Sequence, residues 1–301
     1  MGGAVARELA MKGHTVFTFG RRHASAVQHV LSNYSQWDLL AGPTTAPEVD
    51  AVIHCAAKVG DWGPVADYRR VNVDGTRVVM ETFSDVDRFI HVSSASVYSG
   101  NRGLRQISED ASVGEGLHTA YAVSKAEAEQ LVLDSKRSAV ILRPRAVYGA
   151  GDTTLTPRLL AARRWGLLPV PGDGRNRMSV THILNFVHAV ECVLNSSVKC
   201  GVFNIADSES MSVDELLHAI LRQHSADARL IHVPRSVAWA AAVVSERVWR
   251  FFGSQSAPRL TRYLVAHIAD EYTLDLTSAY EQLGYSPRYS IHDASIHEEH
   301  P

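Results

Sequence analysis

The sequence of 301 residues is 46% hydrophobic and 21% charged, which is typical of a globular protein with enough apolar mass for a full core. Thirty basic and 32 acidic residues give a net charge of −2, which excludes the charge bias of nucleic-acid binders and indicates no polyanionic partner. The three cysteines form no CxxC pair, which argues against a disulfide scaffold or a metal site and favours a reducing, cytoplasmic location. The longest apolar run, 237–244, is too short to span a membrane.

Helical and strand patterns alternate along the first half of the chain. In chain order we expect a helix at 4–12, a strand at 14–19, a helix at 24–31, a strand at 49–54, a helix at 72–83, a strand at 88–92, a helix at 121–133 and a strand at 138–142. This alternation, with strands rich in Val, Ile and Phe, predicts a doubly wound parallel α/β sheet with helices on both faces. Ligands bind such sheets at the carboxyl ends of the strands.

The second half of the chain is less regular. We expect a helix at 155–164, a strand at 202–205 and a helix ending at Gln223, opened by a capping box that starts at Ser212. The sequence therefore predicts a sheet domain over 1–150, to which the strand near 201–206 returns, and a smaller, mostly helical lobe over 151–301.

The first residues of the chain already have a helical pattern. A parallel sheet that binds a dinucleotide normally begins with a strand and a glycine turn before this helix. Gly2 or Gly3 matches the last glycine of such a turn, and the strand and the earlier glycines are absent. We therefore expect that a segment upstream of Met1 is missing, either because the true start lies upstream or because the chain is a truncation. The alternative is that the protein never had this strand.

Tyr121 and Lys125 are the sharpest chemical signal in the sequence. On the expected helix, residues four apart share a face, which places the ammonium near the phenol. A nearby positive charge lowers a tyrosine pKa from about 10 toward working pH. A tyrosine of this kind can exchange a proton with a carbonyl oxygen. Taken alone, the pair is also explained by two neighbouring surface residues.

Hydroxyl groups follow the strand at 88–92, at its carboxyl end. Ser93, Ser94 and Ser96 lie there, and a hydroxyl in this place can donate a hydrogen bond to the oxygen that the tyrosine protonates. Asn72 stands at the start of its expected helix, and taken alone it is explained best as an N-cap.

Five motifs together resemble the extended short-chain dehydrogenase/reductases. They are His54-Cys-Ala-Ala57, Asn72-Val-Asp-Gly-Thr76, Ser93-Ser-Ala-Ser-Val-Tyr98, Tyr121-xxx-Lys125 and Leu142-Arg-Pro-Arg-Ala-Val-Tyr-Gly149, in the order and spacing of that family. The resemblance covers nearly the whole chain. It implies an NAD(P)-dependent enzyme whose sheet domain binds the dinucleotide.

The resemblance also assigns roles to individual residues. It implies that Tyr121 is the general acid/base, that Lys125 lowers its pKa and anchors the ribose, and that Asn72 supports this lysine. Ser94 matches the catalytic hydroxyl, with Ser93 and Ser96 as its competitors. For the cofactor, the resemblance implies contacts from Gly2, Asp38, Leu39, Ala56, Ala57 and Pro144, besides Tyr121 and Lys125. Of the family's GxxGxxG turn, the chain keeps at most Gly2, which leaves pyrophosphate binding open.

The residues after the strand at 14–19 bear on the choice of cofactor. An acidic residue usually ends this strand in folds that select NAD, whereas Arg21 and Arg22 stand here after Gly20. Two guanidinium groups can pair with a 2′-phosphate, so the sequence favours NADP(H) over NAD(H). The alternative is two solvated arginines.

The motifs also separate substrate classes. Sugar dehydratases carry an Asp-Glu pair where this chain has Ala95-Ser96, and many nucleotide-sugar enzymes carry an arginine where it has Met178. The segments 172–182, 185–189, 260–263 and 283–287 resemble the 3β-hydroxysteroid dehydrogenase branch, which includes bacterial 2-alkyl-3-oxo acid reductases; Leu184 departs from its usual Asp.

We therefore predict a Ser-Tyr-Lys oxidoreductase that reduces a ketone, or oxidises the alcohol, of a largely apolar small molecule such as a sterol or a 2-alkyl-3-oxo acid. The alternatives are a nucleotide-sugar 4-epimerase, a catalytically silent NADP-binding sensor and an inactive truncation. The apolar stretch 237–252 has three interpretations, namely core packing, a substrate pocket or contact with a membrane surface. The helices at 72–83 and 121–133 either pack in the core or form a homodimer, as related enzymes do.

Overall fold

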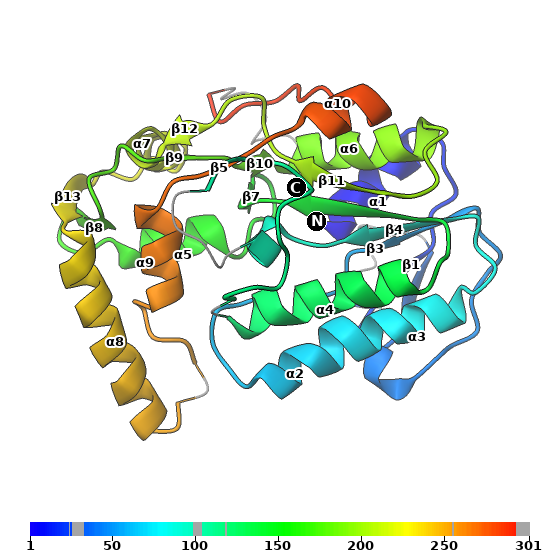
Figure 1. Ribbon diagram of the computed structural model, residues 1–301, viewed down its shortest axis with the longest axis horizontal. Coiled ribbons are helices and arrows are strands. Elements are labelled where there is room, and N and C mark those ends of the chain that lie inside the picture. Colours follow the sequence, from blue (N-terminus) through cyan, green and yellow to red (C-terminus); the bar gives the residue numbers. More distant parts are fainter. Residues whose placement is uncertain (24, 26–32, 99–103, 118, 255, 293–301) are drawn as a thin grey trace.

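The structure is a computed structural model and describes residues 1–23, 25, 33–98, 104–117, 119–254 and 256–292 (Figure 1). Its centre is a parallel sheet in the order β11-β6-β4-β3. The strands are β3 (Ala51–His54), β4 (Arg88–Val92), β6 (Ala139–Pro144) and β11 (Gly201–Ile205). Every residue of β6 is buried, as expected for a central strand with helices on both faces.

Helices cover both faces of this sheet (Figure 1). On one face lie α3 (Gly75–Thr82) and α4 (Ala120–Asp134), whose side of the core includes Val79, Phe89 and Val132. On the other lie α1 (Gly2–Met11), α6 (Ile183–Asn195) and α10 (Thr277–Leu283), around Leu9 and Phe186. The predicted doubly wound α/β architecture is confirmed.

Two further strands form a separate parallel pair, β1 (Thr18–Gly20) and β2 (Tyr34–Gln36). In the described residues this pair shares no ladder with the four-stranded sheet. The helix expected at 24–31 lies outside the described residues, apart from Ser25.

The helix expected at 72–83 begins earlier than its sequence pattern indicated. Helical structure runs without a break through α2 (Val65–Arg69), the π-helical turn η3 (Arg70–Asp74) and α3. Asn72 is therefore inside a helix, and the interpretation of this residue as an N-cap is wrong. The sequence pattern did not indicate the earlier start, because Arg69 and Arg70 are exposed and interrupt the apolar periodicity on which the prediction relied.

The second lobe combines helices with short strands. The helices are α5 (Leu155–Ala162), α7 (Val213–Gln223), α8 (Arg235–Phe251) and α9 (Arg262–Ala269), and the 3-10 turns elsewhere are η2 (Leu39–Ala41) and η4 (Ala95–Tyr98). The strands are β5 (Leu104–Ile107), β7 (Val147–Tyr148), β8 (Leu167–Pro171), β9 (Arg177–Met178), β10 (Thr181–His182), β12 (Met211–Ser212), β13 (Arg229–Val233) and β14 (Tyr272–Leu274). The predicted capping box at Ser212 is confirmed, whereas the β8–β13 pair was not predicted.

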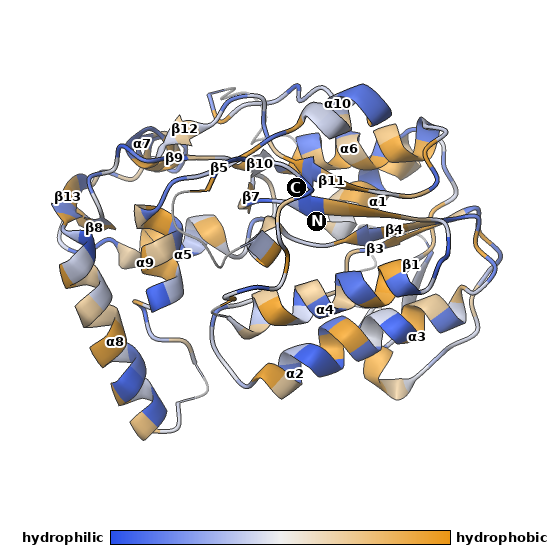
Figure 2. Cartoon of the chain, viewed as in Figure 1, coloured by the Kyte–Doolittle hydropathy of each residue, from blue (hydrophilic) through white to orange (hydrophobic). Residues whose placement is uncertain are grey.

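The two parts of the chain interlock. α6, β11 and α10 all follow residue 150, yet Phe186, Phe203 and Leu283 lie in the same core as Val5 of α1. Figure 2 shows the strands of the central sheet in mostly hydrophobic colours, while the outer faces of the helices carry the hydrophilic ones. The predicted division at residue 150 stays a prediction.

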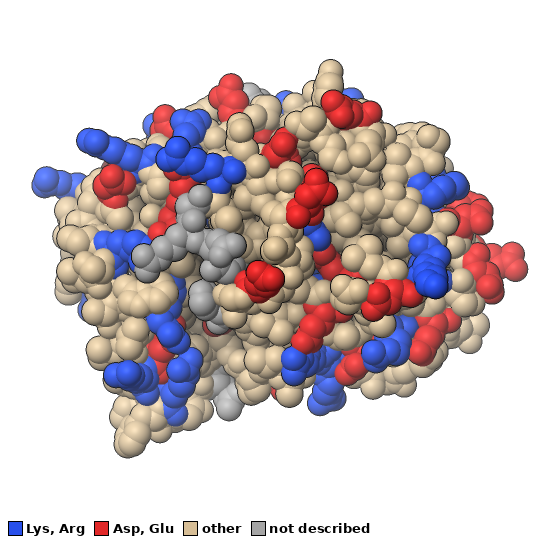
Figure 3. All heavy atoms as spheres, viewed as in Figure 1, with Lys and Arg blue, Asp and Glu red and all other residues tan. Residues whose placement is uncertain are grey.

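Within the described part of the chain, no helix combines the length and the apolar composition that crossing a membrane requires. In the same residues no cluster of three or more His, Cys, Asp or Glu side chains is arranged to hold a metal ion. Acidic and basic side chains are interspersed over the face shown in Figure 3, in keeping with a net charge of −2.

Candidate active site

Ser94 lies just beyond the carboxyl end of β4 and faces α4. Its hydroxyl accepts a hydrogen bond from the backbone N–H of Ser96 at 3.2 Å and is close enough to the phenol of Tyr121 to lower the pKa of that phenol. The hydroxyls of Ser93 and Ser96 are buried and have no hydrogen-bond partner in the described structure. Of the three candidate serines, Ser94 is therefore the one that the fold brings to the tyrosine.

Tyr121 is in the first turn of α4, a helix that Thr119 caps by accepting the N–H of Ala122 at 3.1 Å. Burial raises the pKa of Tyr121 to about 12, and Ser94 opposes this shift. The expectation that Lys125 lowers this pKa stays a prediction.

Lys125 lies one helical turn after Tyr121 and is 2% exposed. Its ammonium donates a hydrogen bond to the carbonyl oxygen of Val92, at the end of β4, over 2.6 Å. Burial lowers the pKa of Lys125 to about 8, while the carboxylate of Glu129 acts in the opposite direction. The group is therefore mostly charged at pH 7.

Asn72 connects three elements around this helix. Its amide nitrogen donates to the hydroxyl of Ser124 at 2.8 Å and to the carbonyl oxygen of Lys58 at 3.0 Å, and its oxygen accepts the N–H of Lys58 at 2.7 Å. Asn72 thus supports the neighbour of Lys125 in α4 and the loop after β3, with no direct bond to Lys125 among its hydrogen bonds.

Two buried histidines under the lysine were missed by the sequence reasoning. His54 and His91 are register partners on β3 and β4, with ring centroids 5.5 Å apart. Burial, with the charge of Lys125 acting in the same direction, lowers the pKa of His54 to about 3 and that of His91 well below its usual range. Both stay neutral, so Lys125 supplies the positive charge here. Their shared place at the ends of Val-Ile-His and Phe-Ile-His strand patterns was the available signal.

The residues expected to contact the cofactor gather around the ends of β3 and β6. A Cβ added to Gly2 would lie 3.3 Å from Cβ of Cys55, so the first turn of α1 is directly against the end of β3. Ala56 is exposed beyond the same strand, and Ala57 is partly exposed. Pro144 ends β6 and is buried. This cradle of small residues fits a dinucleotide, which requires close approach of the backbone.

The residues expected near the adenosine half lie after β1 and β2. Arg21 and Arg22 are exposed, with no ion pair in the described structure. Asp38 is exposed and caps η2 by accepting the N–H of Leu40 at 3.0 Å. Leu39 packs against Gly75, since a Cβ added to Gly75 would lie 3.1 Å from the side chain of Leu39. Capping and packing therefore account for these two residues without a ligand.

A second group of side chains joins the sheet domain to the other lobe. Asp61, in the loop after β3, accepts two hydrogen bonds from Arg158 of α5, at 3.1 and 2.8 Å, and one from Thr261 at 2.5 Å. Tyr263 and His267 of α9 are stacked with centroids 4.9 Å apart, and the phenol of Tyr263 raises the pKa of Tyr121. Through these residues the second lobe contacts the sheet domain on the side where Tyr121 lies.

The segment that carries a diphosphate-binding arginine in many nucleotide-sugar enzymes has a different role here. Met178 is 3% exposed and lies in the core of the second lobe. Arg175 and Arg177 are exposed, and Arg177 donates to Ser210 at 3.1 Å. Asn185 is also structural, because its oxygen accepts the backbone N–H of Arg288 at 2.8 Å.

The apolar stretch 237–252 forms most of α8, at one edge of the molecule (Figure 1). Ala238 and Ala242 are buried against α9. Trp239 packs against the same cluster, whereas Val237, Val244, Val248, Phe251 and Phe252 are exposed. Core packing therefore explains one side of this helix and leaves the exposed apolar side chains unexplained.

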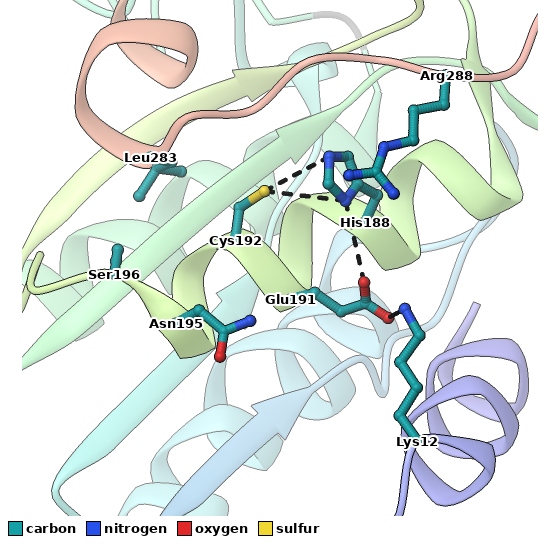
Figure 4. Close-up of a pocket in the computed structure, with 8 residues that line it drawn as sticks. All are labelled: Lys12, His188, Glu191, Cys192, Asn195, Ser196, Leu283 and Arg288. Carbon is teal, nitrogen blue, oxygen red and sulfur yellow. Dashed lines mark hydrogen bonds and ion pairs between the residues drawn. The ribbon is translucent and has the colours of Figure 1, made fainter.

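Figure 4 shows a pocket on the opposite face of the sheet from α4. His188 and Cys192 face it from α6, with the sulfur 3.6 Å from Nε2, and Glu191 forms an ion pair with Lys12. Burial raises the pKa of Cys192 and lowers that of His188. A thiol with a raised pKa is a poor nucleophile, so this pocket is not a reaction centre of the Cys-His type.

A doubly wound parallel sheet with a neighbouring serine and tyrosine, and a buried lysine, at its carboxyl edge defines a class of proteins. These are NAD(P)-dependent enzymes that act on a CH–OH or C=O group. Residues 1–206 match the NAD dependent epimerase/dehydratase family, and the chain belongs to this family.

Known relatives include reductases and dehydrogenases. The chain is 30% identical to a 2-alkyl-3-oxoalkanoate reductase from Stenotrophomonas maltophilia, over 97% of this chain and 93% of that protein. It is 28% identical to 3beta-hydroxysteroid-dehydrogenase/decarboxylase isoform 2 from Arabidopsis thaliana, over 79% of this chain and 46% of that protein.

Among solved structures, the fold is similar to UDP-glucuronic acid 4-epimerase from Bacillus cereus in complex with NAD. The TM-score is 0.73 at 20% identity, over 98% of this chain and 93% of that one. The relatives support an NAD(H)-type cofactor for this chain, and the described cradle around Gly2 fits one.

Proposed function

We propose that this protein is a ketoreductase that uses Ser94, Tyr121 and Lys125 on a largely apolar ketone such as a sterol or a 2-alkyl-3-oxo acid. The observation that carries the proposal is that the hydroxyl of Ser94 acts on the phenol of Tyr121, beside the buried ammonium of Lys125 at the end of β4. A silent sensor needs no such proton relay. The relatives named above act on substrates of the same kind.

Each group has a distinct task in reduction. With its pKa raised to about 12, Tyr121 is a neutral phenol at pH 7 and can donate its proton to the carbonyl oxygen. Ser94 donates a hydrogen bond to the same oxygen as negative charge develops. Lys125 keeps a positive charge one turn away in α4. When bound, the nicotinamide cofactor supplies the hydride. Gly2, Ala56 and Ala57 are the residues that would lie against it.

The second candidate, a nucleotide-sugar 4-epimerase, would use the same relay. The fold favours it as much as a ketoreductase, since solved epimerase structures are similar. The substrate side argues against it, because Met178 is a core residue and Arg175 and Arg177 are exposed on the surface of the lobe.

We also propose a preference for NADP(H). Arg21 and Arg22 are exposed after β1, and the neighbouring residues Gly20 and His23 bring no carboxylate. A fluorescence titration should show tighter binding of NADPH than of NADH. The double variant Arg21→Gln/Arg22→Gln should weaken NADPH binding at least about tenfold and leave NADH unchanged. Equal loss for both cofactors would contradict the proposal.

Tyr121→Phe tests the relay. We expect kcat for ketone reduction to fall by about 10³-fold, because the proton donor is lost, while NADPH binding measured by fluorescence stays within a few-fold. Tyr280→Phe is the matched control, since Tyr280 is 66% exposed on α10. Near-normal turnover by Tyr121→Phe would show that another group donates the proton.

Homodimer formation and contact with a membrane surface stay predictions. The outer sides of α2 and α4 are joined within one chain by an ion pair between Arg69 and Glu127. The exposed apolar side chains of α8, among them Phe251 and Phe252, are the surface that a membrane contact would use.

A further inference from the structure

Among the residues that the structure describes, Arg145 is a buried cation without an acidic partner. It follows β6 directly and is 2% exposed. Its Nη1 donates to Nε2 of His267 at 3.0 Å, and its guanidinium lies 3.6 Å from the ring centroid of Tyr272. Its Nε and Nη2 are buried and have no hydrogen-bond partner in the described structure.

The other buried arginine of the described chain, Arg143, is fully paired. Its Nε and Nη2 donate to the carboxylate of Glu129 at 3.0 and 2.6 Å, and its Nη1 donates to the hydroxyl of Tyr98. Arg143 is the penultimate residue of β6, and Arg145 directly follows the last residue of the same strand. Arg143 has its carboxylate within the protein, whereas the same pair of N–H groups of Arg145, Nε and Nη2, meets no hydrogen-bond partner among the described residues.

The side chains around Arg145 leave its charge uncompensated. Asp61 is occupied by Arg158 and Thr261. Burial, together with the charges of Arg145 and Arg158, lowers the pKa of His267 well below its usual range, so this histidine is a neutral acceptor. An unpaired buried charge is costly to a fold, which favours a ligand that carries the missing negative charge.

Packing also connects Arg145 to the proposed relay. Its guanidinium lies over the ring of Tyr272, whose hydroxyl donates to the carbonyl oxygen of Ala95, the residue after Ser94. Its Nη1 contacts His267, which is stacked on Tyr263. These contacts place Arg145 on the side of the second lobe that faces Ser94, so a group bound to Arg145 and a carbonyl bound at Ser94 can belong to one ligand.

We propose that Nε–H and Nη2–H of Arg145 bind a carboxylate of the substrate, which makes the substrate an oxo acid whose carboxylate lies close to the reacting carbonyl. The inference rests on the proposed ketoreductase function and narrows its substrate class. Two parallel N–H groups on one edge of a guanidinium match the two oxygens of a carboxylate. A diphosphate would bring more negative charge than one cation balances, because Arg158 is already paired with Asp61.

The test compares a 2-alkyl-3-hydroxy acid with its methyl ester, in the wild type and in Arg145→Met. Oxidation by NADP⁺ yields the ketone, NADPH and a proton, and it is followed by NADPH absorbance. We expect the wild type to prefer the acid, and Arg145→Met to lose about 100-fold in kcat/KM on the acid with the ester within a few-fold. Arg175→Met is the matched control, an exposed arginine of the second lobe.

Thermal unfolding with each ligand and NADPH decides the inference without turnover. The acid should raise the Tm of the wild type more than the ester does, and this difference should vanish in Arg145→Met. Without ligand, Arg145→Met should melt no lower than the wild type, because it removes an unpaired charge. Equal effects of acid and ester in the wild type would overturn the inference. Absence of turnover with an intact acid-specific Tm shift would overturn the ketoreductase proposal alone.

Discussion

His54 gives the sharpest quantitative prediction, a loss of stability in mild acid. Its ring is 4% exposed, and its Nε2 lies 3.0 Å from the hydroxyl of Thr76. That hydroxyl donates its own proton to the carbonyl oxygen of Asn72, so Nε2 of His54 carries the proton and donates to Thr76. The ring is a neutral donor, and protonation would place a second charge beside Lys125.

The size of the effect follows from the pKa. In the unfolded chain His54 takes up a proton near pH 6.5, whereas in the folded protein it does so only near pH 3. Its contribution to stability is therefore complete above pH 6.5 and is lost as the pH falls below that value. At about 1.4 kcal/mol per pH unit, His54 alone costs about 2 kcal/mol of unfolding free energy between pH 7 and pH 5. The lowered pKa values of His91 and His267 act in the same direction.

Urea unfolding at pH 7 and pH 5 measures this loss, with His54→Gln as the test variant. Glutamine keeps a donor for Thr76 and does not titrate, so the variant should lose about 2 kcal/mol less than the wild type between the two pH values. Asp207, whose pKa burial raises to about 6, acts in the opposite direction but cancels in the comparison. Thr76→Val is the control, since it removes the hydrogen bond between Thr76 and His54 but leaves the imidazole of His54 free to titrate. This variant should therefore keep the loss of unfolding free energy between pH 7 and pH 5. Equal losses in wild type and His54→Gln would refute the reasoning.

Three further predictions concern the ion pair, a glycine and the lysine. Arg143→Met leaves Glu129 buried without its cation and should cost about 3–5 kcal/mol in urea unfolding, most of it recovered when Glu129→Leu is added. Gly174→Ala should lower the free energy of unfolding by roughly 1–3 kcal/mol more than Gly166→Ala does. Both glycines have positive φ, so the backbone strain is shared. A Cβ added at Gly174 would lie 2.0 Å from Oδ1 of Asp214, whereas one added at Gly166 meets nothing within 4 Å. The pKa of Lys125, about 8, predicts that kcat/KM for the cofactor falls above pH 8 as the ammonium is lost, and a flat profile to pH 10 would contradict a charged role for this group.

The local patterns in the sequence were enough to place the elements that carry the proposed relay. The strand at 88–92 was predicted with its observed bounds, and the helix at 121–133 was predicted to within one residue at each end. Ser94 follows this strand, and Tyr121 and Lys125 share one face of this helix. Because the periods of strands and helices are properties of neighbouring residues, the sequence by itself determined the sheet architecture and the elements on which these three residues lie, while the family resemblance supplied their proposed roles.

The electrostatic state of the site required the tertiary structure. The pKa of Tyr121 rises because burial disfavours the charged phenolate, an effect that the spacing of side chains in the sequence does not reveal. The partners of Asn72 come from α4 and from the loop after β3, which no helical pattern relates to it. Arg145 differs from Arg143 solely in what the rest of the fold places around it. Burial and partnership arise from segments far apart in the chain, so the tertiary structure alone decided that Arg143 is paired with Glu129 while Nε and Nη2 of Arg145 have no partner among the described residues.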